Sequence, residues 1–222
     1  MGEYFSWVNV DKKEYISPCD FDLGNKRYES IHWGNELLCA LRELLSKEWN
    51  GDHIFFMGDQ NLINKDTKNE TLKILYEHSD KFGYPGDGFD TVYESYKNVS
   101  GLFKETEEYV REEIGFYLSG LERGCDINEY GIDISDPFQG LFQREGRDFI
   151  YTINHNKRVC YSFEKTKILF KDGEECDFAD PLPILMVYGS NRIPGEWVGD
   201  IIGVSDNVPE GYEVLKEIVL EW

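Results

Sequence analysis

The stretch Trp49-Asn50-Gly51-Asp52-His53-Ile54 decides the fold, because the chain contains it twice. The second copy, Trp197-Val198-Gly199-Asp200-Ile201-Ile202, repeats the Trp, Gly, Asp and Ile at the same spacing. We call this pattern the box. A glycine followed by an aspartate favours a tight turn, and the apolar residues that follow are typical of a strand. The box therefore predicts a turn that leads into a strand, with the tryptophan as core anchor.

A second pair of segments supports a duplication. Asn9-Val10-Asp11-Lys12-Lys13 matches Asn154-His155-Asn156-Lys157-Arg158, and the separation of these segments is close to that of the two boxes. Two matches with nearly the same separation along the chain indicate an internal repeat. We predict a single α+β domain over residues 1–222, with a mainly antiparallel sheet built from two diverged hairpin-plus-box halves. The halves cover residues 1–80 and 147–222, and a helical insert covers 81–146.

Hydrophobic periodicity predicts the elements of the first half. Apolar and polar residues alternate from Tyr4 to Val10 and return at 14–16, which is typical of a hairpin. Leucines at helical spacing predict a helix over 35–47 with Asn35 as its N-cap. A buried strand is expected at 53–57 and a helix at 70–78. The glycine-rich segment 83–88 lacks the Lys and Ser/Thr of a phosphate loop and is expected to be a turn.

The rest of the chain is predicted as one long helix followed by strands. An apolar stripe and an acidic face predict a helix over 103–123. The strand predictions are hairpins at 148–154 with 157–163 and at 168–176, and strands at 183–188 and 201–204. The last segment, 212–222, fits a strand and a helix equally well.

Composition limits the kinds of partner. The chain has 43 Asp and Glu against 23 Lys and Arg, a formal net charge of −20, and the acidic excess is spread along its whole length. Such a charge repels nucleic acid and anionic lipid surfaces, and it attracts basic proteins or cations. We therefore expect no nucleic-acid or membrane partner.

The five cysteines are odd in number and widely spaced, without a Cys-x-x-Cys pair. This pattern argues against a zinc ribbon and against a disulfide framework, and it favours a reducing cytoplasm. No apolar run has the length of a membrane span, and no signal peptide is recognisable.

The opening segment, Tyr4 to Ile16 followed by Pro18, resembles the start of a group of uncharacterised bacterial proteins. These proteins begin with a similar Asn-x-Asp-Lys-Lys/Arg-Glu-Tyr hairpin and carry a downstream Trp-x-Gly-Asp-x-Ile box that ends in Gly-Asp. The resemblance covers about residues 4–60. It implies the hairpin-plus-box architecture and implies no activity.

Two kinds of catalytic site were considered. The sequence has only four histidines and no Gly-x-Ser-x-Gly motif, which argues against a nucleophilic hydrolase. A divalent-metal-dependent enzyme acting on a small substrate is the alternative function, with Asp52, Asp59 and Asp200 as ligands if the two halves pair around a pseudo-twofold axis. A ligand sensor would need a pocket between the halves, which a sequence does not show.

The leading hypothesis is an acidic, non-enzymatic interaction protein without a cofactor. It would bind a basic partner protein, and an immunity or inhibitor protein against a toxin is the concrete version. Charge complementarity speeds association and selects partners. The expected contact residues lie on the acidic face of the 103–123 helix and in the acidic tract that follows it: Glu105, Glu108, Glu112, Asp126, Glu129 and Asp133.

Overall fold

The structure is a computed structural model that describes residues 2–24, 26–106, 144–190 and 193–220. Helices and sheets occur together, so the predicted α+β class is confirmed. The described α-helices are α1 (Glu36–Ser46), α2 (Glu70–Phe82), α3 (Gly88–Ser95) and the four-residue α5 (Leu182–Leu185). The strands are β1 (Phe5–Asn9), β2 (Glu14–Ile16), β3 (Ile54–Gly58), β4 (Lys97–Asn98), β5 (Tyr151–Asn154), β6 (Val159–Tyr161), β7 (Lys167–Phe170), β8 (Val187–Tyr188), β9 (Ile202–Ser205), β10 (Glu213–Val214) and β11 (Glu217–Leu220).

The sheets are mixed, which corrects the expectation of a mainly antiparallel sheet. Each half has an antiparallel centre, β2-β1-β3 in the first and β6-β5-β9 in the second. Parallel strands then join the edges: β4 beside β2, β8 beside β3, and β10 beside β6. A separate parallel pair consists of β7 and β11. Strands from the distant part of the chain therefore complete sheets that begin as local hairpins.

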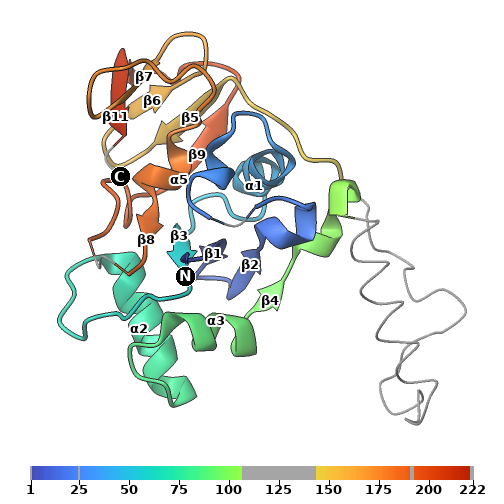
Figure 1. Ribbon diagram of the computed structural model, residues 1–222, viewed down its shortest axis with the longest axis vertical. Helices are drawn as coiled ribbons and strands as arrows, with labels where there is room; N and C mark the ends of the chain where they lie inside the picture. Colours follow the sequence, from blue (N-terminus) through green and yellow to red (C-terminus); the bar gives the residue numbers. More distant parts are fainter. Residues whose placement is uncertain (1, 25, 107–143, 191–192, 221–222) are drawn as a thin grey trace, which may run out of the picture.

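Helix α1 lies between the two larger sheets, and α2 and α3 cover the other face of the five-stranded sheet (Figure 1). The largest apolar cluster joins α1 to both halves, since it contains Trp7 of β1, Trp49 and Trp197. A second cluster fills the space between the five-stranded sheet and the α2–α3 pair. The two halves thus share one core around α1.

The five-stranded sheet is buried on both faces, and the sequence of β3 shows how. Ile54 and Phe56 belong to the cluster around α1, whereas Phe55 and Met57 belong to the cluster under α2 and α3. Successive side chains of a strand point to opposite faces, so a continuous apolar run fits a strand with a core on each side. The buried strand predicted at 53–57 is confirmed.

Helix α1 follows its sequence signals closely. The Asn35 side chain accepts a hydrogen bond from the backbone N–H of Leu38 at 2.9 Å, which confirms the predicted N-cap. The five leucines of the helix are all buried: Leu37, Leu38, Leu41, Leu44 and Leu45. Helix α2 begins in the same way, with Asn69 accepting from the N–H of Leu72 at 3.2 Å, and extends past the predicted end at His78.

The two copies of the box form turns with the same hydrogen bonds. In the first copy, Asn9 Nδ2 donates to Asp52 Oδ2 at 2.8 Å, and Asn9 Oδ1 accepts from the backbone N–H of Lys12 at 2.9 Å. The second copy has the same two bonds, at 2.8 and 2.9 Å, between the equivalent residues Asn154, Asp200 and Lys157. Each box aspartate therefore fastens the start of its strand to the hairpin beside it through the side chain of an asparagine.

The glycines of the two boxes give a matched test of this turn. Gly51 and Gly199 have φ values of +83° and +98°, where an L side chain is strained. A Cβ on Gly51 meets no atom within 4 Å, but a Cβ on Gly199 would lie 3.0 Å from the side chain of Asn69, the N-cap of α2. We expect Gly51→Ala to lower the free energy of unfolding by about 1–2 kcal/mol from backbone strain alone, and Gly199→Ala by about 1 kcal/mol more because the cap is displaced. Urea unfolding of both variants measures this difference, and equal losses would contradict it.

Several predicted elements differ from the structure. Residues 183–188 are not one strand, because Pro181 and Pro183 fit the first turn of the short helix α5, and only Val187 and Tyr188 pair with β3. The hairpin at 168–176 keeps its tight turn, with Gly173 at φ +89°, but its return is a single bridge from Leu169 to Glu175. The segment 83–88 turns as expected and then starts α3, which the sequence did not predict. The segment 212–220 forms strands.

The start of the predicted 103–123 helix also differs. Phe103 is extended and bridges to Arg144, and it lies between two 3-10 turns, Ser100–Leu102 and Lys104–Thr106. Residues 107–143 lie outside the described residues, and the rest of the predicted helix lies there with them.

Candidate functional site: a buried arginine beneath exposed aromatic rings

The aspartates proposed as metal ligands have separate partners. The Lys12 ammonium lies 3.3 Å from Asp52, and the Lys157 ammonium lies 3.6 Å from Asp200. Asp59 accepts a hydrogen bond from the backbone N–H of Tyr4 at 3.1 Å. Among the described residues, no group of three or more His, Cys, Asp or Glu side chains is placed to hold a metal ion. The geometry therefore gives the metal-dependent alternative no site at these residues.

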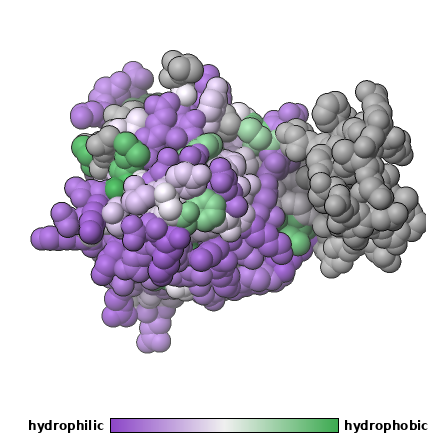
Figure 2. Space-filling view, turned by 90° about the horizontal axis from the view of Figure 1, so that it is seen from below, coloured by the Kyte–Doolittle hydropathy of each residue, from purple (hydrophilic) through white to green (hydrophobic). Residues whose placement is uncertain are grey.

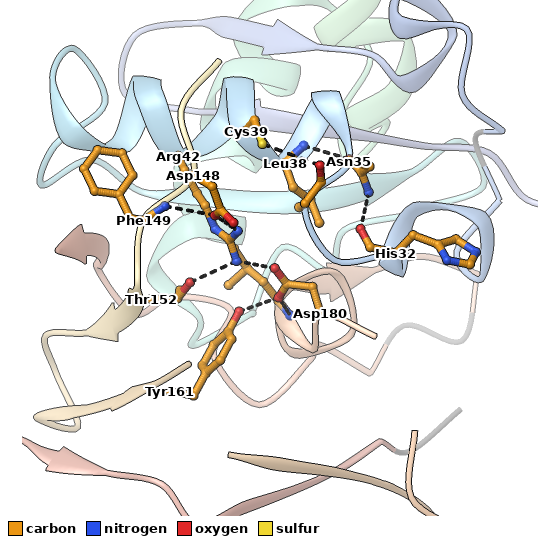
Figure 3. Close-up of polar contacts among 12 residues, drawn as sticks. His32, Asn35, Leu38, Cys39, Arg42, Asp148, Phe149, Thr152, Tyr161 and Asp180 are labelled. Carbon is orange, nitrogen blue, oxygen red and sulfur yellow. Dashed lines mark hydrogen bonds and ion pairs between the residues drawn. The ribbon is translucent and has the colours of Figure 1, made fainter. Parts of the chain in front are cut away.

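The most unusual polar group in the described structure is Arg42. It lies on α1 between two leucine pairs, and its side chain is fully buried. Its guanidinium forms ion pairs with Asp180, which is also fully buried, and with Asp148, which is 42% exposed (Figure 3). A buried charge is tolerated only when it is paired and hydrogen-bonded. The first half of the chain therefore places a cation in the core, and its described ion-pair partners both come from the second half.

The partners of Arg42 are themselves held by further hydrogen bonds. The other carboxylate oxygen of Asp180 accepts from the Tyr161 hydroxyl at 2.5 Å and from the backbone N–H of Leu182 at 2.9 Å. Thr152 on β5 lies 3.5 Å from the guanidinium. Arg42, Asp180 and Tyr161 thus form a connected polar network inside an apolar core, and we call it the arginine network (Figure 3).

Electrostatics keep Arg42 charged and Tyr161 protonated. Burial disfavours the charged guanidinium, but the carboxylates of Asp180 and Asp148 outweigh this cost and hold the pKa of Arg42 above its ordinary value. Burial, together with the Asp180 charge, raises the pKa of the Tyr161 hydroxyl well above its ordinary value. Tyr161 therefore remains a hydrogen-bond donor to Asp180. A charged guanidinium and a protonated phenol, both fully buried, are suited to fixing structure and not to acid–base chemistry.

The arginine network contacts a group of aromatic rings that reaches the surface. The Arg42 guanidinium lies 4.7 Å from the ring centre of Trp33, and Trp33 packs against Phe163 at 5.2 Å. The backbone N–H of Trp33 donates to the carbonyl of Phe178 at 2.9 Å, and Phe178 contacts the rings of His32 and Tyr28. We call these five residues the aromatic surface: Tyr28, His32, Trp33, Phe163 and Phe178.

The aromatic surface combines exposure with negative charge. Tyr28 and Phe163 are each 52% exposed, although large aromatic rings are usually buried. Exposed carboxylates follow or precede its rings directly in the chain, namely Glu29 after Tyr28, Glu164 after Phe163 and Asp177 before Phe178. Figure 2 shows one face of the molecule, which is largely hydrophilic with small, separate hydrophobic areas. Within the aromatic surface, Tyr28, His32 and Phe163 are exposed, whereas Trp33 and Phe178 are partly buried against the core.

The contact residues predicted from the sequence remain a prediction. The backbone of Glu105 lies in a 3-10 turn, Lys104–Thr106. The other five lie outside the described residues: Glu108, Glu112, Asp126, Glu129 and Asp133. Sequence reasoning missed Arg42, although an arginine inside a leucine stripe was a signal that it could have used.

Two histidines give the stability of the fold a pH dependence. Burial lowers the pKa of His78, whose Nδ1 lies 2.7 Å from the Tyr96 hydroxyl, and nearby Lys13 and Lys81 act in the same direction. Burial also lowers the pKa of His155. On acidification, the unfolded chain therefore binds protons at these residues before the folded chain does. Their contribution to stability is complete above the ordinary value of about 6.5 and falls as the pH drops from there to the lowered folded pKa.

We expect His78→Gln to reduce this loss. The urea midpoint of the wild type should fall between about pH 7.5 and about pH 5.5, and the variant should show a smaller fall. Tyr84→Ala, a change at an exposed residue that leaves all four histidines in place, serves as the control and should keep the wild-type fall. An unchanged pH dependence in His78→Gln would show that this histidine is not responsible.

Comparison with known proteins gave no relative. No protein family, no curated protein and no solved structure matches the chain. Within the described ranges, no helix has the length and apolar character needed to cross a membrane.

Proposed function

We propose that the protein is an acidic, non-enzymatic interaction protein that binds a basic partner protein through the aromatic surface. An immunity or inhibitor protein against a toxin is the concrete version. The single observation that carries the proposal is the group of aromatic rings beside the buried arginine network, in which Tyr28 and Phe163 are each 52% exposed and carboxylates adjoin the rings in the chain.

Aromatic rings suit this role for a physical reason. Tryptophan and tyrosine contribute a large share of the binding energy at protein interfaces, where they are enriched. Trp33 is fixed by Arg42 below it and Phe163 beside it, so little side-chain entropy is left to lose on binding. The surface thus provides anchors that are already ordered before the partner arrives.

The charge of the chain defines the partner. A net charge of −20 attracts a basic protein over long range and repels nucleic acid. Glu29, Glu164 and Asp177 place part of this charge at the rings themselves. Complementary charge raises the association rate and selects against acidic competitors, while the rings supply the short-range contacts.

Phe163→Ala provides the most direct test. A basic partner purified from the native host by pull-down should bind about tenfold more weakly to this variant in calorimetry, a loss of about 1.4 kcal/mol. Tyr84→Ala is the matched control, because Tyr84 is 44% exposed and lies outside the aromatic surface, and it should bind like the wild type.

Salt provides a second readout. Raising the ionic strength from about 50 mM to about 500 mM should weaken binding by slowing association, because charge steering is screened. A pull-down that yields no basic protein, together with salt-insensitive binding, would refute the proposal. Equal losses in Phe163→Ala and Tyr84→Ala would place the contact elsewhere on the protein.

A further inference from the structure

The two larger sheets have the same kind of edge strand. In each sheet a short strand pairs in parallel with the second strand of the hairpin, β4 with β2 and β10 with β6. The N–H of Lys97 donates to the carbonyl of Lys13 at 2.8 Å. The N–H of Glu213 donates to the carbonyl of Arg158, the residue equivalent to Lys13 in the repeat, at 3.1 Å. β4 and β10 are therefore equivalent strands at equivalent edges.

A tyrosine precedes each of these strands, and its hydroxyl contacts a histidine. The Tyr96 hydroxyl lies 2.7 Å from His78 Nδ1, and the Tyr212 hydroxyl lies 2.9 Å from His155 Nδ1. The rings meet edge to face in both cases, with their centres 5.9 Å apart. We call them the tyrosine–histidine pairs. His78 lies on α2, whereas His155 lies between β5 and β6, so the histidines of the two pairs come from unrelated parts of the sequence.

A neutral imidazole and an imidazolium make different hydrogen bonds with a phenol. A neutral ring has one nitrogen that accepts, so a tyrosine hydroxyl can donate to it, whereas both nitrogens of an imidazolium carry hydrogens. Burial, together with the charge of Asp11, raises the pKa of the Tyr96 hydroxyl, so this phenol keeps its hydrogen. Protonation of His78 therefore reverses the bond and takes away the acceptor of the Tyr96 hydroxyl.

The surroundings of His78 also favour the neutral ring. Burial is the largest cause that lowers its pKa, and the nearby charges of Lys13 and Lys81 act in the same direction. The carboxylates of Glu77 and Asp11 oppose them without reversing the shift. The folded first pair is therefore most stable with an uncharged histidine.

The second pair is packed differently and has the same preference. The His155 ring lies across Gly203 of β9, where a Cβ would stand 2.4 Å from Nε2, and burial lowers the pKa of His155. The charged residues beside this pair either line a groove with His155 or lie over the Tyr212 ring: Lys47, Arg147, Asp206 and Arg158. Arg147 is paired with Asp206, and Lys47 is paired with Glu43.

We propose that the two tyrosine–histidine pairs form a pH-sensitive switch, which holds β4 and β10 on their sheets while the histidines are neutral and releases them on acidification. Release of either strand carries its tyrosine away and opens the histidine to water, where it takes up a proton at its ordinary value of about 6.5. The strands are therefore held fully above this pH and less strongly below it. The switch does not depend on the aromatic surface, so either proposal can fail without the other.

Amide hydrogen exchange followed by NMR measures the release at the strands themselves. The reporters are the amides that donate across the two parallel edges: Lys97 and Val99 for β4, and Glu213 and Leu215 for β10. Between about pH 7.5 and about pH 5.5, their protection factors should fall by about two- to tenfold. About tenfold is the upper limit for one histidine, because the lower pH is about one unit below its ordinary value.

His78→Gln and His155→Gln serve as controls for each other, because glutamine can accept from the tyrosine hydroxyl and does not titrate. His78→Gln should remove the fall at Lys97 and Val99 and keep it at Glu213 and Leu215. His155→Gln should do the reverse. If exchange at the reporters required global unfolding, either variant would reduce the fall at all four amides equally, and this result would overturn the proposal. A wild type without any fall would overturn it as well.

Tyr96→Phe tests the first pair without changing a histidine. It removes the hydroxyl and keeps the ring, so the protection factors of Lys97 and Val99 should fall about threefold at about pH 7.5, while those of β10 stay as in wild type. Unchanged protection at Lys97 and Val99 would show that the pair does not hold β4, and the switch would be wrong.

Discussion

Replacing Arg42 by methionine is expected to lower the free energy of unfolding by about 3–5 kcal/mol, the usual cost of removing one partner of a buried ion pair. The change leaves the fully buried Asp180 without its cation, while the Tyr161 hydroxyl and the Leu182 N–H remain as its hydrogen-bond donors. Because methionine fills most of the volume of the arginine side chain, the expected loss of stability measures the missing charge and not a cavity. Urea unfolding followed by tryptophan fluorescence measures it.

Two further variants distinguish the contribution of the Arg42–Asp180 ion pair from that of Asp148. Asp148→Asn should cost only about 1 kcal/mol or less, because Asp148 is 42% exposed and water screens its charge. The double variant Arg42→Met/Asp180→Asn leaves no buried charge and should regain much of the stability that Arg42→Met loses. An Arg42→Met variant within about 0.5 kcal/mol of wild type would contradict a structural role for the arginine network.

Removing the tryptophan of the first box should have an effect of similar size. Trp49 is fully buried, and its indole N–H donates to the Glu14 carboxylate at 2.8 Å. Trp49→Ala is expected to lower the free energy of unfolding by about 3–5 kcal/mol because it opens a large cavity where α1 meets the five-stranded sheet. Trp49→Phe should cost less, because a ring remains and only the indole donor and part of the volume are lost.

The second box gives an internal comparison. Trp197 is 2% exposed and packs against Tyr161 at 5.8 Å, so Trp197→Ala should cost about 3–5 kcal/mol as well. Tyr4→Ala, at a residue that is 48% exposed, is the control and should change stability by about 0.5 kcal/mol or less. If either box tryptophan tolerated alanine as well as Tyr4 does, its role as a core anchor would be wrong.

Local signals explain which elements the sequence could predict. Helix α1 has a cap at Asn35 and leucines at helical spacing, so a window of about a dozen residues contains everything that the prediction needs. The hairpins β1–β2 and β5–β6 likewise depend on alternation and on a turn of a few residues. The match between the two boxes could be found because both copies keep the residues that the turn needs.

Long-range pairings explain what the sequence could not predict. The β7–β11 pair is parallel and joins segments about 50 residues apart. Nothing in the sequence of either short strand indicates which strand it pairs with. Residues 183–188 looked like a strand because four apolar residues in a row fit a strand and a buried helix equally well. Pro183 fits the first turn of a helix, which explains why this segment begins as α5.

The candidate site shows the same limit. Trp33 and Phe163 meet only because β6 and η2, the 3-10 turn Glu29–Ile31, are brought together by the core around α1. Neither residue stands out in its own window, whereas the acidic face of the 103–123 segment does. The sequence therefore predicts a contact region from its local run of acidic residues. It does not predict the aromatic surface, whose residues come together only in the tertiary structure.

The distance between Arg42 and Asp180 along the chain also has a consequence for biosynthesis. The two residues are 138 positions apart, which corresponds to roughly 7–28 s of translation at about 5–20 residues per second. During this interval the nascent first half carries a cation for its core without the carboxylate that neutralises it, and it lacks β8, the edge strand of its sheet. The first half has its own hairpin and box, but its core is therefore complete only after the second half has been synthesised.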